Sequence, residues 1–170
     1  MGIGGVRTWK ELHGIPCIEF EDTEQAKKQI MISRTFAKDI TDPEDLSAQV
    51  SMFCAMAVEK LRKQGSYCGN VTTFITTNRF HKDNGRFQFE SRLTQFPTST
   101  DSTIEINAAV MKTLQEMFRK GYGYKRAGVV LGDIIPADKV QMAFFDDIDR
   151  ERHARLMNVI DSINRRDGRN

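Results

Sequence analysis

The stretch Ile30-Met31-Ile32-Ser33-Arg34-Thr35-Phe36-Ala37-Lys38 decides the fold of this chain. Apolar and polar residues alternate from Ile32 to Lys38, and this period of two residues predicts a β-strand whose two faces differ. Arg34 and Lys38 have the parity of Phe36, so we predict that these three side chains share a face. A strand with cations on one face and a core on the other is suited to a sheet that lies against a polyanion.

Further strands and two helices follow this stretch. We expect strands at 67–80, 86–96 and 125–135, and helices that begin at Thr41-Asp42-Pro43-Glu44 and Ser102-Thr103-Ile104-Glu105, two capping-box patterns in which Thr41 and Ser102 would cap. Apolar residues then recur at helical spacing. They are Leu46, Val50, Phe53, Ala57 and Leu61 in the first helix, which Gly65 would end, and Ile104, Ala108, Met111, Leu114 and Phe118 in the second.

The predicted fold class is α+β, with the order β-α-β-β-α-β. Both helices are crossovers, and the right-handed crossover rule places them on one face of a four-stranded, mainly antiparallel sheet. The other face stays open. The strand at 125–135 is apolar from Ala127 to Leu131 and is predicted to be central. An extended tail and a C-terminal helix with apolar residues at helical spacing follow Pro136.

Composition narrows the function classes. The 170 residues are 39% hydrophobic and 28% charged, as in one globular domain with appendages. The formal net charge is +2, so any nucleic-acid surface must arise from local clustering of cations. Three cysteines without a Cys-x-x-Cys pair argue against a disulfide framework and a zinc site. With no apolar run long enough to span a bilayer, we expect a cytoplasmic protein.

We expect no metal site and no catalytic site. His13, His81 and His153 lie far apart in the sequence, and we interpret them as solvated loop histidines and not as metal ligands. The acidic run Asp146-Asp147-x-Asp149 is interpreted as a solvated cluster.

Basic residues cluster in or beside the predicted strands and in the turn at 78–85. Phosphate contacts need Lys or Arg together with short hydroxyl donors. The candidate DNA-binding residues are Ser33, Arg34, Lys38, Arg79, Lys82, Arg86, Arg92, Lys125 and Arg126. In the strand at 86–96, the apolar residues and the charged residues fall on opposite faces. The alternative is that the cations only make a solvent face soluble, and the small net charge leaves both interpretations open.

The tail contains Gln141-Met142-Ala143-Phe144-Phe145, in a segment with no predicted strand partner. A polar anchor followed by two adjacent large apolar residues is typical of an extended peptide that enters a partner's pocket. The alternative is that Phe144 and Phe145 fold back onto the domain's own core.

Four separated motifs occur in the order found in the UmuC subunits of bacterial DNA polymerase V. Val6–Cys17 resembles the end of their thumb domain, and Ile32–Phe36 resembles the first strand of their little finger domain. Ala127–Asp133 resembles the last strand of that domain, and Gln141–Asp147 resembles their sliding-clamp-binding motif. The resemblance covers nearly the whole chain.

The resemblance implies a Y-family translesion DNA polymerase that acts in SOS-type DNA damage tolerance. In that family the little finger sheet lies in the major groove of template-primer DNA. The implied clamp-binding residues are Gln141, Met142, Phe144 and Phe145. Phe144 stands where Leu is commoner in the family. The implied division is 1–14 end of thumb, 15–29 linker, 30–135 little finger, 136–149 clamp-binding segment and 150–170 C-terminal helix.

The chain departs from the family because it lacks the palm and fingers, whose carboxylates bind two magnesium ions for nucleotidyl transfer. We therefore expect a piece of a longer DNA-directed DNA polymerase that is itself not an enzyme and holds no cofactor, magnesium belonging to the parent polymerase. Expected partners are damaged or primed DNA and the sliding clamp, with a UmuD-type dimer and RecA in the parent complex.

Two alternatives remain open. The chain could be a protein-interaction module that binds mainly the clamp, a UmuD-type partner or RecA. It could also be a small ferredoxin-like binding domain unrelated to repair, although such a domain has no need of an exposed Gln-x-x-Phe-Phe tail.

Overall fold

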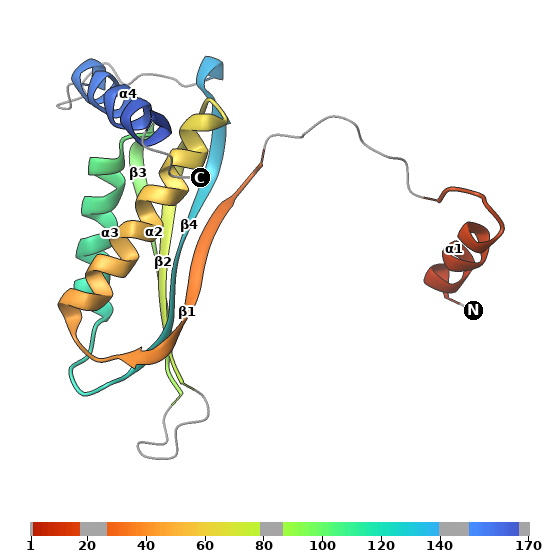
Figure 1. Ribbon diagram of the computed structural model, residues 1–170, viewed down its shortest axis with the longest axis horizontal. Helices are drawn as coiled ribbons and strands as arrows, with labels where there is room; N and C mark the ends of the chain where they lie inside the picture. Colours follow the sequence, from red (N-terminus) through yellow and green to blue (C-terminus); the bar gives the residue numbers. More distant parts are fainter. Residues whose placement is uncertain (1, 18–26, 79–86, 140–149, 167–170) are drawn as a thin grey trace.

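A computed structural model of the chain describes residues 2–17, 27–78, 87–139 and 150–166 (Figure 1). Helices and strands follow the predicted order. The elements are α1 (Ile3–Leu12), β1 (Ile30–Ile40), α2 (Pro43–Lys63), β2 (Ser66–Thr77), β3 (Phe89–Thr100), α3 (Thr103–Met117), β4 (Tyr124–Pro136), the 3-10 helix η1 (Ala137–Lys139) and α4 (Arg150–Arg166).

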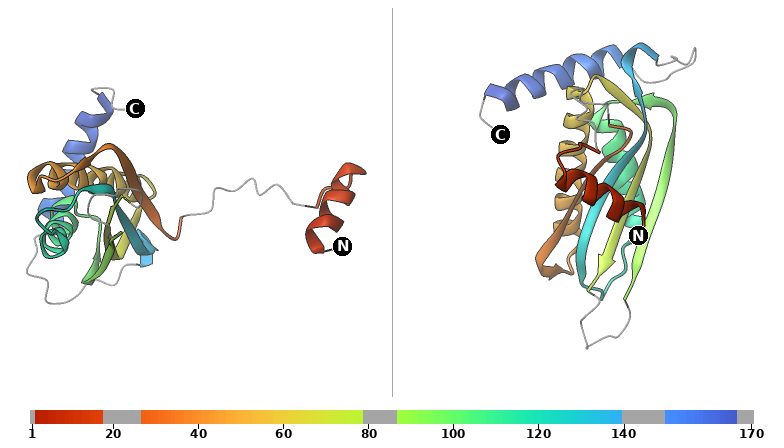
Figure 2. Two further views of the ribbon diagram at one scale, coloured as in Figure 1. Left: turned by 90° about the horizontal axis from the view of Figure 1, so that it is seen from below. Right: turned by 90° about the vertical axis from the view of Figure 1, so that its right-hand side faces the viewer.

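The four strands form one antiparallel sheet in the order β1-β4-β2-β3. Helices α2 and α3 lie side by side on the same face of this sheet (Figures 1 and 2). Strand β4 pairs with β1 on one side and with β2 on the other, so the strand predicted to be central is central. The predicted fold class, a four-stranded sheet with two helices on one face, is confirmed.

The core lies between the sheet and the two helices. All five apolar residues predicted for the first helix are buried in α2: Leu46, Val50, Phe53, Ala57 and Leu61. They pack with the inward residues of the central strands, and burying each large apolar side chain is worth about 1.5–3 kcal/mol.

The start of α2 differs from the prediction by one residue. Asp42 caps the helix, because its Oδ1 accepts hydrogen bonds from the backbone N–H groups of Glu44 at 2.7 Å and Asp45 at 3.4 Å. Thr41 was the wrong candidate: Pro43 occupies the first helical position, so the cap is the residue directly before it. Gly65 follows the end of the helix with φ at +63°, a backbone conformation that favours glycine.

The cap of α3 was predicted correctly, and its buried face was predicted in part. Ser102 Oγ accepts from the Glu105 N–H at 3.5 Å. Leu114 is buried as predicted, but Ile104 is 48% exposed, whereas Ile106 and Val110 are buried. Apolar residues occur around most of α3, so packing against α2 and the sheet selects the buried face.

Strand β3 continues past Pro97 to Thr100, whereas the strand predicted from the sequence ends at residue 96. β3 lies at the edge of the sheet, where a residue without an N–H does not interrupt a ladder on both sides. The β2–β3 register shifts between Asn70, which faces Gln95, and Cys68, which faces Thr100.

Candidate nucleic-acid interface

Cross-strand register assigns three rows of side chains to the face of the sheet opposite the helices. On β4, Ala127, Val129 and Leu131 are buried in the core, so the residues that alternate with them along the strand point to the opposite face. The rows are Thr35, Arg126, Thr76 and Phe89; Ser33, Gly128, Phe74 and Ser91; and Met31, Val130, Thr72 and Leu93. We call these residues the open face.

Arg126 is the only cation within the three rows as described. Its Nη2 donates a hydrogen bond to Ser33 Oγ at 3.0 Å, and its guanidinium carbon lies 5.9 Å from the centre of the Phe74 ring. The side chain is exposed. A guanidinium held over a ring still presents further N–H donors, in the planar arrangement that suits phosphate oxygens.

Gly128 allows this cluster to form. A Cβ at this position would lie 2.5 Å from Phe74 Cζ and 2.5 Å from Ser33 Cβ, which is too close for real atoms. Without a side chain on Gly128, the Phe74 ring covers β4 and is only 7% exposed although it lies on the open face. Arg126, Phe74 and Ser33 are therefore packed together before any ligand arrives.

Two predicted cations lie on the other face of the sheet. Arg34 is opposite Ala127 in register, and Phe36, which has the same parity, stacks on Phe53 of α2 at 6.3 Å between ring centres. Arg92 is opposite Thr73 and pairs with Glu116 of α3 at 2.8 Å. The prediction that these two cations lie on the open face was wrong. Alternation separates the two faces of a strand, but it does not show which face the helices cover.

Arg34 and Arg92 are nevertheless exposed, because β1 and β3 are the two edge strands. Lys38 is exposed in the part of β1 where the register shifts. Lys125 is tied to the same edge: its Nζ donates to the Ala37 carbonyl at 2.9 Å and lies 3.5 Å from Asp39 Oδ1. Of the predicted DNA-binding residues that the structure describes, the cations therefore lie at the two margins of the sheet, apart from Arg126 on the open face.

The remaining predicted site residues lie outside the described residues. They are Arg79, Lys82 and Arg86 of the β2–β3 connection, and Gln141, Met142, Phe144 and Phe145 of the tail.

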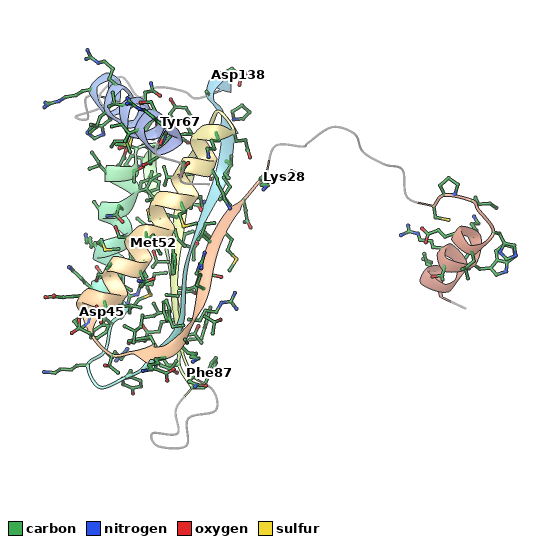
Figure 3. All side chains as sticks on the ribbon, viewed as in Figure 1. Lys28, Asp45, Met52, Tyr67, Phe87 and Asp138 are labelled. Carbon is green, nitrogen blue, oxygen red and sulfur yellow. The ribbon has the colours of Figure 1, made fainter. Side chains whose placement is uncertain are left out.

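Three exposed apolar residues of the open face were not among the predicted site residues. Phe89 is 56% exposed, Leu93 is 58% exposed and Met31 is 51% exposed. The signal in the sequence was the parity of Phe89 and Leu93, which is opposite to that of Arg92. Phe87 lies at the end of the sheet where β2 and β3 are joined (Figure 3). There it lines a shallow hollow of about 250 Å³ together with Gln88, Arg119 and Tyr122.

Other kinds of site find little support in the described ranges. These ranges contain no group of three or more His, Cys, Asp or Glu residues that could hold a metal ion. No helix within them is long and apolar enough to cross a membrane. Burial raises the pKa of the Cys54 thiol to about 12 and is the main cause of the rise to about 12 at Cys68, so neither is a nucleophilic thiolate near neutral pH.

Comparison with known proteins agrees with this geometry. The impB/mucB/samB family C-terminal domain matches residues 27–144. Protein UmuC of Salmonella typhimurium is 38% identical over 164 residues, which are 96% of this chain and 39% of that relative. The chain thus spans about two fifths of the length of the UmuC relative.

Two solved structures share the fold. The insertion ternary complex of Dbh DNA polymerase has a TM-score of 0.52 and 14% identity, over 78% of this chain and 36% of that one. A Y-family DNA polymerase chimera has a TM-score of 0.50 and 14% identity, over 78% of this chain and 36% of that one.

The resemblance found in the four sequence motifs is confirmed by the family match and by the UmuC relative. The sheet, its two covering helices and its uncovered face are the parts that the matched region contains. The chain belongs to the impB/mucB/samB family and carries its C-terminal domain.

Proposed function

We propose that this chain grips template-primer DNA against its open face for a translesion polymerase in SOS-type DNA damage tolerance. The supporting observation is a sheet face that none of the described helices covers, on which short hydroxyl side chains surround one held guanidinium. Hydroxyl and guanidinium groups donate hydrogen bonds to phosphate oxygens. Such contacts position a protein on DNA without reading the base sequence.

The positions of the other cations support the same proposal. Four strands span about 14 Å across the sheet, close to the width of about 12 Å of a B-DNA major groove. Arg34 and Lys38 at one margin and Arg92 at the other would then face the phosphates that flank the groove. Arg79, Lys82 and Arg86 are proposed to extend this contact from the β2–β3 connection.

The first test is a fluorescence anisotropy titration of labelled primer-template DNA at low and at physiological salt. We expect affinity to fall steeply with salt, because phosphate contacts release counterions. Arg126→Ala should weaken binding and reduce the slope of log K against log salt by about 1. The matched control is Lys60→Ala, which removes one exposed cation from α2 and should leave both unchanged. Affinity that does not depend on salt, or no binding at low salt, would contradict the proposal.

Nucleotidyl transfer is proposed for the parent polymerase and not for this chain. The part of the UmuC relative that this chain does not match would supply the catalytic carboxylates and their two magnesium ions. The sliding clamp is proposed to bind Gln141, Met142, Phe144 and Phe145, and this proposal rests on the sequence motif. A UmuD-type dimer and RecA are proposed as partners of the parent complex.

A second candidate function is a protein-interaction module for the clamp, a UmuD-type partner or RecA. It is favoured by α4, which exposes apolar side chains on one side. They are Leu156, Val159, Ile160 and Ile163. Binding of one of these proteins, with no binding of DNA at any salt concentration, would support this second function in place of the first.

A further inference from the structure

Strand β3 turns two large apolar side chains, Phe89 and Leu93, to solvent and its charged side chains toward a helix, while its Phe96 packs against the core. Phe89 and Leu93 are both more than half exposed on the open face. On the other face, Glu90 pairs with Arg119 just beyond α3 at 3.1 Å and Arg92 pairs with Glu116 at 2.8 Å. The uncovered face of an antiparallel sheet normally carries polar side chains, so this inversion needs a ligand or a function.

The exposed ring of Phe89 is held in place from below. Its centre lies 6.1 Å from that of Phe74, with the two ring planes inclined by 32°. Phe74 is almost fully buried and in turn lies under the Arg126 guanidinium. Phe89, Phe74 and Arg126 thus form a continuous series across β3, β2 and β4. A ring backed by a buried ring loses little conformational freedom when a flat group stacks on it.

The chemistry around this series selects the ligand. An apolar patch alone would suit a protein or a lipid, but Arg126, Ser33 and Ser91 beside it suit phosphates. A ligand that has flat apolar groups and phosphates at regular spacing is a nucleic acid. Bases inside a duplex are stacked on one another and show only their edges in a groove, so a stacking surface can be used only by unpaired bases.

We propose that the open face binds single-stranded DNA by stacking an unpaired base on Phe89, with Leu93 as a flanking apolar contact and Arg126 and Ser33 on the phosphates. The proposal rests on the proposed DNA grip insofar as both use Arg126. It goes beyond that grip because a contact with the base itself, and not only with the backbone, contributes to affinity.

The test compares two labelled single strands of equal length and charge, an oligothymidylate and an abasic strand that has the same phosphates without bases. The full chain should bind the oligothymidylate about tenfold more tightly, the effect of stacking about one base. Phe89→Ala should abolish this preference, so that both strands bind with about equal affinity, and should leave the affinity for the abasic strand unchanged. Phe89→Tyr should keep the preference, because it keeps the ring.

Glu90→Gln is the matched control, since it alters the next residue of the same strand on the opposite face and should keep the preference. Equal affinity of the unaltered chain for the two strands would overturn the proposal, and so would a preference that survives Phe89→Ala. In either case a steep salt dependence with primer-template duplex would show that the proposed grip still stands. Binding of neither strand, with self-association in analytical ultracentrifugation that Phe89→Ala abolishes, would identify the open face as a protein interface instead.

Discussion

At the scale of single residues, the three cysteines differ in access to solvent. Cys54 and Cys68 are buried in the core, while Cys17 is partly exposed. The pKa of each buried thiol rises from 9.0 to about 12, mainly because burial penalises the charged thiolate. At pH 8, an aromatic disulfide reagent should therefore label one thiol of the native protein rapidly and three in urea. Rapid labelling of two or three thiols in native buffer would contradict the packing of the core.

The same two thiols make stability depend on alkaline pH. In the unfolded chain they ionise near pH 9.0, while in the folded chain they remain protonated until about pH 12. The unfolded state therefore loses protons first, and the free energy of unfolding contributed by these groups falls as pH rises from about 9 to about 12. Urea midpoints at pH 8 and pH 10 should show this fall, and Cys54→Ala should reduce it.

At the scale of elements, α4 is attached to the domain by charged, polar and apolar contacts. Arg62 of α2 donates two hydrogen bonds to Asp161, at 2.7 Å from Nε and 2.8 Å from Nη2. Ser102 Oγ lies 3.0 Å from His153 Nδ1, and Met157 is only 4% exposed. Figure 1 shows α4 crossing the ends of α2 and α3. The tail helix thus docks on its own domain, at the start of α3.

Asp161→Asn should loosen this docking. The change removes the negative charge to which the largely buried Arg62 guanidinium donates two hydrogen bonds. We expect this to weaken the docking of α4 by about 1–3 kcal/mol. Hydrogen exchange should show reduced protection of the amides in 150–166 and unchanged protection in β4. Ser162→Ala is the matched control, because Ser162 Oγ bonds only within α4, to the Val159 carbonyl. Unchanged protection in Asp161→Asn would mean that the Ser102–His153 contact and the apolar contacts hold the helix without this ion pair.

At the scale of the whole molecule, DNA binding is proposed for the open face and clamp binding for the tail motif at 141–145. The Phe144→Ala and Phe145→Ala pair should lower affinity for the sliding clamp more than tenfold, because burial of each ring is worth about 1.5–3 kcal/mol. Affinity for primer-template DNA should stay unchanged. Arg126→Ala should show the reverse pattern, and titration of both ligands against both variants checks this. Clamp binding that survives the double substitution would exclude the tail motif as the anchor.

Much of the fold could be predicted from the residues because the signals are local. Alternation in β1, the apolar repeat in α2, the Ser102 cap and the apolar run in β4 each depend on neighbours a few residues away. The order of these elements and the right-handed crossover rule then leave one layered arrangement. The candidate site was harder to predict, because it joins residues from four strands.

The sequence by itself determined the elements, their order, the central place of β4 and the family. Only the tertiary structure decided which face of each element is covered. Alternation showed that Arg34 and Ser33 lie on opposite faces, but pairing with β4 placed Ser33 beside Arg126 and Arg34 at the helix side. Likewise, packing chose the buried face of α3 and turned Phe89 to solvent. The physical reason is that periodicity depends on one segment, whereas burial depends on every segment packed against it.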